Sequence, residues 1–109
     1  MSLTISIYEK SLFARIAAWR LGVGSVAIVF RNTIYLHNTT RVDFLANKQW
    51  LCHELQHVVQ YRKMGTIKFL FYYFIYFLKY GYRNNPLEIE ARENEGNQKL
   101  LINLKIKKK

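Results

Sequence analysis

Residues 50–60 read WLCHELQHVVQ, and this stretch holds two of the three histidines of the 109-residue chain. On an α-helix, residues four positions apart lie one above the other. His53 and His57 can therefore present two imidazole nitrogens to one metal ion from the same helix face. Glu54, between them, is placed to act on a water molecule at that ion. The stretch thus predicts a helix that carries a metal-binding pair.

The flanking residues place this pair well inside a helix. Arg62 and Lys63 followed by Gly65 are typical of a helix C-terminus, and Thr39 or Thr40 is the expected start. Apolar residues recur at helical spacing between these ends, at Phe44, Leu45, Trp50, Leu51, Leu55, Val58 and Val59. His-Glu-x-x-His on a helix is typical of zinc-dependent hydrolases. The alternative is a purely structural pair of histidines beside a solvated glutamate.

Two histidines leave a catalytic zinc ion one protein ligand short, because such sites normally use three and keep the fourth position for water. A metzincin would supply a third histidine at position 63, with a glycine at position 60. This chain has Gln60 and Lys63 at those positions. The metzincin class is therefore excluded.

The third ligand is expected from residues 84–95, which read NNPLEIEARENE. Asn85 followed by Pro86 predicts the start of another helix. Glu88 and Glu90 are the candidate ligands, and they lie on different faces of that helix, so both cannot bind one ion without distortion. Glu88 has an alternative role, because at the third helical position it can close a capping box with Asn85.

HELQH followed by a helix of the form Glu-x-x-Ala resembles the gluzincin metallopeptidases, and in particular the small minigluzincins. The resemblance implies a Zn²⁺ ion held by His53, His57 and Glu88. It also implies that Glu54 is the catalytic general base and that the substrate is a peptide or protein. In gluzincins an edge strand next to the metal helix receives the extended substrate, and residues 34–37 look able to do the same. The alternative is an ordinary strand that covers the helices.

The chain departs from this family at one supporting position. Ala91 falls at the small position after Glu88, but Arg92 stands where many gluzincins have an aspartate or asparagine that supports a zinc histidine. That supporting role is then either vacant or filled from elsewhere in the chain. Related enzymes also use a tyrosine or histidine to stabilise the oxyanion, and the candidates here are Tyr82, Tyr80 and Tyr61.

The whole pattern predicts an α+β fold, a mostly helical minimal zincin-like domain with a small two- or three-stranded sheet packed on the HELQH helix. Residues 1–109 are expected to form one domain. Short β-branched runs predict strands at Val26–Phe30 and Ile34–His37, which form either a hairpin or two adjacent strands. Helices are expected from about Ile7 to Leu21, from Thr39 or Thr40 to Gly65, between Gly65 and Gly81, and from Pro86 to about Leu104.

Cysteine content and the N-terminal sequence indicate the compartment. A lone cysteine, Cys52, excludes an intramolecular disulfide, suits a reducing compartment and is expected to be a buried small hydrophobe. Arg15 and Arg20 interrupt the apolar stretches of the first thirty residues, so a cleavable signal peptide is not expected. A cytoplasmic location is therefore predicted.

Charge and aromatic content predict possible partners. Residues 69–78 read FLFYYFIYFL, too short to span a bilayer, and favour a buried core helix, with an interfacial helix at a membrane surface as the alternative. The net charge is +10, and residues 105–109 form a basic tail. No nucleic-acid-binding fingerprint accompanies this charge, which disfavours nucleic acid. The competing function is a non-catalytic basic zinc-binding module that contacts nucleic acid, an anionic membrane or an acidic protein.

Overall fold

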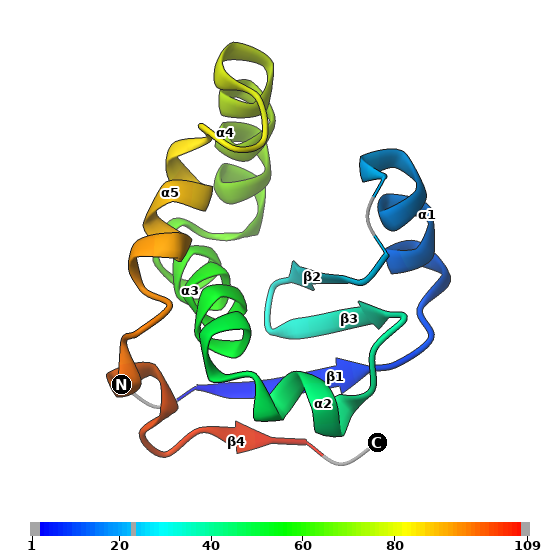
Figure 1. Ribbon diagram of the computed structural model, residues 1–109. Coiled ribbons are helices and arrows are strands. Elements are labelled where there is room, and N and C mark those ends of the chain that lie inside the picture. Colours follow the sequence, from blue (N-terminus) through cyan, green and yellow to red (C-terminus); the bar gives the residue numbers. More distant parts are fainter. Residues whose placement is uncertain (1–2, 23, 108–109) are drawn as a thin grey trace.

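The computed structural model describes residues 3–22 and 24–107, and these form a four-stranded sheet with five α-helices and one 3₁₀ helix (Figure 1). The predicted α+β class is confirmed. The elements in chain order are β1 (Thr4–Tyr8), α1 (Leu12–Leu21), β2 (Val26–Phe30), β3 (Thr33–His37), α2 (Arg41–Ala46), α3 (Lys48–Met64), α4 (Thr66–Tyr80), α5 (Pro86–Glu93), η1 (Gln98–Leu101) and β4 (Lys105–Ile106).

The sheet has the strand order β2-β3-β1-β4, which gives four strands where two or three were expected. β2 and β3 form the predicted antiparallel pair, and β1 is parallel to both β3 and β4. The expectation that residues 34–37 form an edge strand is wrong, because β1 covers that side of β3. The edge strand beside α3 is β2.

The N-terminal prediction is also corrected, since the helix expected from about Ile7 begins only at Leu12. Residues 4–8 form β1, in which buried Ile5 and Ile7 alternate with less buried neighbours. This period of two is the pattern of a half-buried strand. Ser11 caps the following helix, because its side chain accepts a hydrogen bond from the backbone N–H of Ala14 at 3.2 Å.

The long helix expected around HELQH is divided into two at Asn47. This residue is extended, with φ −87° and ψ 90°, and therefore ends α2. Its side chain then accepts a hydrogen bond from the N–H of Trp50 at 3.1 Å and caps α3. Thr40 caps α2 in the same way, through the N–H of Asp43 at 3.0 Å. His53 and His57 consequently lie well inside α3, as predicted.

The C-terminal helix is shorter than expected. α5 ends at Glu93, and the chain continues through η1 into β4 instead of remaining helical to Leu104. Part of the predicted basic tail therefore belongs to the sheet, because Lys105 and Ile106 pair with β1. Residues 108–109 of that tail lie outside the described part of the chain.

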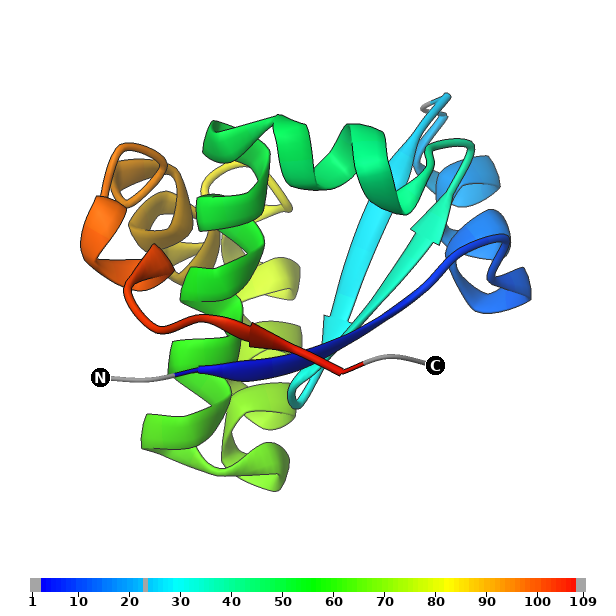
Figure 2. The ribbon, with the colours of Figure 1, turned by 90° about the horizontal axis from the view of Figure 1, so that it is seen from below.

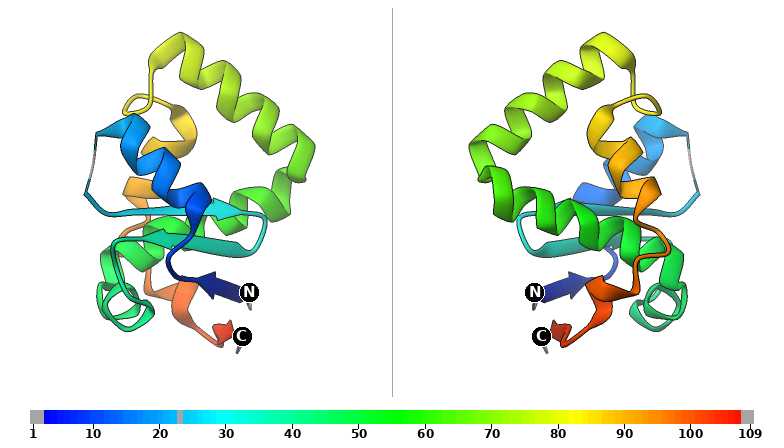
Figure 3. Two further views of the ribbon diagram at one scale, coloured as in Figure 1. Left: turned by 90° about the vertical axis from the view of Figure 1, so that its right-hand side faces the viewer. Right: turned by 90° about the vertical axis from the view of Figure 1, so that its left-hand side faces the viewer.

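The hydrophobic core lies between the sheet and α3. Figures 2 and 3 show α1 on one side of the strands and α3 on the other. Packing of α3 against the sheet leaves its inner face almost without solvent contact, which fixes the direction in which its histidines point. Cys52 is buried here, as expected. The buried residues of this core are Leu3, Ile5, Ile7, Ile34, Leu36, Phe44, Leu51, Cys52, Leu55, Val58, Val59 and Leu100.

The aromatic helix α4 is not the buried core helix that its composition favours. It rises beyond the sheet at one end of the molecule (Figure 1), and Phe69 is its buried residue. Gly65, at φ +86°, separates it from α3, and Gly81, at φ +81°, ends it. Among residues 3–22 and 24–107, no helix combines the length and apolar character needed to cross a bilayer.

Candidate metal centre

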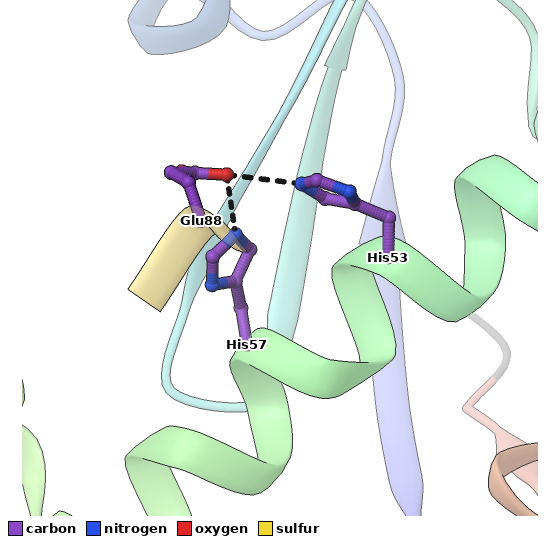
Figure 4. A group of neighbouring side chains, drawn as sticks. All are labelled: His53, His57 and Glu88. Atoms are coloured by element: carbon purple, nitrogen blue, oxygen red, sulfur yellow. Dashed lines mark hydrogen bonds and ion pairs between the residues drawn. The ribbon is translucent and has the colours of Figure 1, made fainter. Parts of the chain in front are cut away.

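Two histidines of α3 and one glutamate of α5 converge on a single point (Figure 4). Nε2 of His53 lies 3.0 Å from Oε1 of Glu88, and Nε2 of His57 lies 3.2 Å from the same oxygen. One ligand atom from each residue lies within 4.8 Å of the other two. Within the described part of the chain, this is the one group of three or more His, Cys, Asp and Glu residues with that geometry.

Helix capping places Glu88 opposite the histidines. Asn85 is completely buried and caps α5, with its side-chain oxygen 2.9 Å from the N–H of Leu87. Its side-chain amide also donates to the carbonyl of Tyr73 at 3.1 Å. The start of α5 is thereby fixed to α4, and the first turn of α5 directs Glu88 toward α3. The carboxylate of Glu88 bonds across the helices and not back to the cap, so the capping-box alternative is not what the structure shows.

The outer nitrogens of both imidazoles have hydrogen-bond acceptors. Nδ1 of His53 lies 2.8 Å from Oε2 of Glu95, and Nδ1 of His57 lies 2.8 Å from Oε1 of Gln60. The amide of Gln60 is oriented by its own donation to Glu90 at 2.9 Å. Both acceptors select the tautomer with a proton on Nδ1, which leaves Nε2 as the ligand atom in the neutral ring.

These contacts supply the support that Arg92 cannot give. Arg92 donates to the backbone carbonyl of Arg83 instead of contacting either histidine. Glu95 and Gln60 perform the orienting role in its place. Sequence reasoning missed both, since only Glu88 and Glu90 were candidates in that segment and Gln60 was considered only as an argument against a metzincin. Gln60 follows His57 by three positions, so helical spacing was an available signal for it.

Glu88 is held as an ionised carboxylate. Burial disfavours ionisation, but hydrogen bonds from His53 and His57 outweigh it and hold the pKa of Glu88 well below its usual range. Its second oxygen, Oε2, accepts a hydrogen bond from the hydroxyl of Tyr73 at 2.6 Å. Tyr73 belongs to the aromatic helix α4, and no motif in the sequence indicated that it reaches this site.

The pKa values of both histidines shift in the opposite direction, upward. Burial disfavours the charged form of His53, but its hydrogen bond to Glu88 and the charge of Glu54 outweigh that and raise its pKa to about 9. The pKa of His57 is also raised, because the hydrogen bond and charge of Glu88 outweigh burial. Without a metal, positive charge in the form of protons is therefore favoured at the point where the ligand atoms meet. A divalent cation at this point would be stabilised by the same carboxylates.

Glu54 lies next to this cluster and is almost entirely buried, with 7% of its surface exposed. Burial raises its pKa to about 7, and the charges of His57 and His53 partly oppose this shift. A carboxyl group with a pKa near neutrality can both accept and release a proton at physiological pH. This is the property that a general base and acid requires.

A cavity of about 500 Å³ opens over the cluster. All five residues of β2, Val26–Phe30, line one side of it, and α3 and α4 line the other. His53, His57 and Glu88 contribute to its wall together with Glu54. The candidate ligands and the candidate base are therefore accessible from one space, whose remaining lining is mainly apolar.

The three tyrosines proposed from the sequence differ in their relation to this cavity. Tyr82 lines it, and burial together with the charges of Glu88 and Glu54 raises its pKa well above the usual value. Tyr61 also lines it, but its hydroxyl donates to the carbonyl of Val29 at 3.2 Å. Tyr80 is half exposed and its ring contacts Tyr76. Tyr82 is thus the best placed of the three.

Glu90, the alternative third ligand, lies outside the cluster. Its Oε1 accepts hydrogen bonds from Gln56 at 2.8 Å and from Gln60 at 2.9 Å. These bonds lower its pKa from the usual value. Glu90 therefore acts through Gln60, which it helps to orient against His57. Of the two candidates, Glu88 is the residue that the fold brings to both histidines.

Replacement of Glu95 by alanine is expected to lower zinc affinity by about tenfold, because residues that orient a metal-binding histidine typically contribute 10- to 100-fold. Competition with a chromophoric chelator would measure this. Glu93→Ala is the matched control, since it removes the same charge from an exposed position two residues away. Equal affinities of the two variants would contradict an orienting role for Glu95.

Comparison of the chain with protein-family models, with curated proteins and with solved structures gives no match. The relation to the gluzincins therefore stays a resemblance of motif and spacing. The case for a function depends on the geometry of this centre and on the chemistry of its residues.

Proposed function

We propose that this chain is a zinc-dependent peptidase in which Glu54 is the general base. The observation that carries the proposal is the convergence of His53, His57 and Glu88, whose ligand atoms lie within 4.8 Å of one another on the wall of a cavity shared with Glu54. Two imidazole nitrogens and one carboxylate oxygen form a donor set used by catalytic zinc sites. With three protein ligands, a tetrahedral site keeps one position for solvent or substrate.

Different residues of the chain have different tasks in the proposed reaction. Zinc, when bound, supplies Lewis acidity that polarises a substrate carbonyl and makes water more acidic. Glu54 takes a proton from the attacking water and later delivers it to the leaving amine. Its burial keeps bulk water from competing for that proton. Glu95 and Gln60 hold the imidazole rings in place during these steps.

The edge strand β2 is the proposed site of substrate binding. It forms one side of the cavity and pairs with β3 along its other side. An extended peptide can add to such an edge through main-chain hydrogen bonds, which hold a peptide bond in a defined register. Apolar groups of Phe69 and Phe77 face the same cavity. We therefore expect cleavage next to apolar side chains.

The experiment that tests this function combines metal analysis with a cleavage screen. Purified protein is expected to bind one zinc ion per chain and to cleave members of an unbiased peptide library, with activity lost on chelation and restored by zinc. Mass spectrometry of the products gives the cleavage sites. A protein that takes up no zinc, when zinc is offered at neutral pH, would contradict the proposal.

The excess of positive charge supports a second candidate, a non-catalytic basic zinc-binding module. The chain has 17 Lys and Arg residues against seven Asp and Glu residues. Such a module would use zinc to stabilise the fold and the basic surface to bind an anionic partner. The two candidates differ in the role of Glu54, because a module without catalysis would bind its partner equally well after Glu54→Gln.

A further inference from the structure

Helix α4 exposes a continuous apolar stripe. Ile67, Phe71, Phe74 and Leu78 are 85%, 58%, 59% and 64% exposed. Their spacing of four, three and four residues places them on one face of the helix. This face points away from Phe69 and Tyr73, which pack toward the candidate metal centre. The stripe is thus available for contact with another surface.

Two lysines lie beside this stripe. Lys68 and Lys79 are three helical turns apart and so lie on the same face, about 90–110° from the middle of the stripe. Tyr72, Tyr76 and Tyr80 form a row farther round the helix, about 130–170° from the middle of the stripe, with ring centroids 5.8 and 6.2 Å apart. An apolar stripe with lysines beside it is the pattern of a helix that lies in a membrane interface.

The sequence interval that contains α4 carries charge of one sign. The sequence contains no Asp or Glu between Glu54 and Glu88, whereas this interval holds five basic residues, at Arg62, Lys63, Lys68, Lys79 and Arg83. Helix α1 lies at the same end of the molecule (Figure 1) and belongs to a second interval without acidic residues, from Glu9 to Asp43. Both intervals are therefore complementary to an anionic surface.

Helix α1 carries an exposed apolar stripe of its own. Leu12, Ile16 and Trp19 recur at helical spacing and are 68%, 53% and 78% exposed. Trp is enriched where proteins meet the interface of a bilayer. Both helices line the cavity, α1 through Ala17 and α4 through Leu70 and Phe77. Two elements that expose apolar residues therefore border the cavity.

We propose that α4 binds the surface of an anionic bilayer, with its apolar stripe among the acyl chains near the headgroups and with Lys68 and Lys79 on the lipid phosphates. A second copy of the chain fits the stripe less well, because two chains of charge +10 would bring their lysines together. The binding goes beyond the proposed peptidase activity and requires neither metal nor hydrolysis. It would place the candidate active site next to the membrane.

Flotation with lipid vesicles tests how much the apolar stripe of α4 contributes to membrane binding. The protein is expected to float with vesicles of equal parts phosphatidylglycerol and phosphatidylcholine and to bind pure phosphatidylcholine far more weakly. The double variant Phe71→Ser with Phe74→Ser should bind the anionic vesicles about tenfold less tightly or worse, because insertion scales with buried apolar area. The matched control is Val42→Ser with Ile102→Ser, which changes residues 76% and 57% exposed outside α4.

The charge contribution is tested by Lys68→Gln with Lys79→Gln. We expect about a thirtyfold loss on anionic vesicles, because each lysine near such a surface contributes about 1 kcal/mol, which is about fivefold in affinity. Lys99→Gln with Lys105→Gln removes the same net charge from η1 and β4, and should have a much smaller effect. Equal losses from the two pairs would overturn the proposal. So would a lipid-free dimer that Phe71→Ser with Phe74→Ser dissociates, since the stripe would then serve self-association.

Discussion

Replacement of Glu54 by glutamine is expected to lower kcat for peptide cleavage by about 10²- to 10⁴-fold, the range that general acid–base catalysis typically contributes. Glutamine keeps the size and shape of the side chain but cannot take a proton from water. Bound zinc is expected to stay at one ion per chain, because Glu54 is not among the converging ligands. The measurements are cleavage kinetics on a peptide from the screen and metal analysis of the same sample.

Loss of folding would not explain such a result. The pKa of Glu54 is raised to about 7 by burial, so the folded protein favours the neutral form of this side chain. A neutral amide should therefore be accommodated, and the melting temperature at pH 8 should not fall. Unchanged kcat in a variant that binds zinc normally would remove Glu54 from the mechanism. An unfolded variant would instead point to a structural role for the buried carboxylate.

The local part of the candidate centre could be predicted because it depends on one helix. His53, Glu54 and His57 are fixed relative to one another by helical periodicity alone, and their sequence spacing is sufficient to place them on or near one face. Glu88 is different, since its approach depends on the packing of α5 against α3. The resemblance to gluzincins indicated this residue, but the residues by themselves left Glu90 open.

The supporting residues could not be predicted in this way. Glu95 lies beyond the end of α5, and the turn that returns it to His53 is not encoded by any periodic pattern. Tyr73 is one of eight tyrosines in the chain, and its contact with Glu88 depends on the angle at which α4 leaves Gly65. Contacts of this kind follow from tertiary packing, and sequence spacing does not determine them.

In the fold, too, features that depend on local sequence could be predicted, and features that depend on tertiary packing could not. The hairpin of β2 and β3 was predicted because its two strands are adjacent in sequence and β-branched. β1 was missed although Ile5 and Ile7 alternate with less buried residues, because a helix was expected from Ile7. A two-residue strand such as β4, which pairs with the opposite end of the chain, has no sequence signal of its own. The exposure of α4 was missed for another reason. A helix that is hydrophobic all round shows no polar face from which its environment can be inferred.

Without metal, the protein is expected to lose stability as the pH rises from 6 to 9. The folded-state pKa of His53 is about 9, above its ordinary value of 6.5, so its stabilising contribution is complete below pH 6.5 and is lost through pH 9. The pKa of Glu54 is raised to about 7 from 4.5, and its contribution is likewise lost as the pH rises through 7. Glu88, with a lowered pKa, stays ionised throughout this range.

Zinc should reverse this trend, because it binds neutral imidazoles and displaces the protons from His53 and His57. Binding therefore tightens as the pH rises over the same range. The free zinc concentration is kept the same at every pH and is a hundredfold above Kd at neutral pH. Under that neutral condition we expect the melting temperature to increase by about 10 °C, since this saturation contributes about 2.7 kcal/mol. Thermal denaturation with and without zinc, repeated between pH 6 and 9, should show a difference that widens with pH. Glu88→Gln should reduce that difference sharply, and a difference that narrows with pH would show that these histidines do not release protons to the metal.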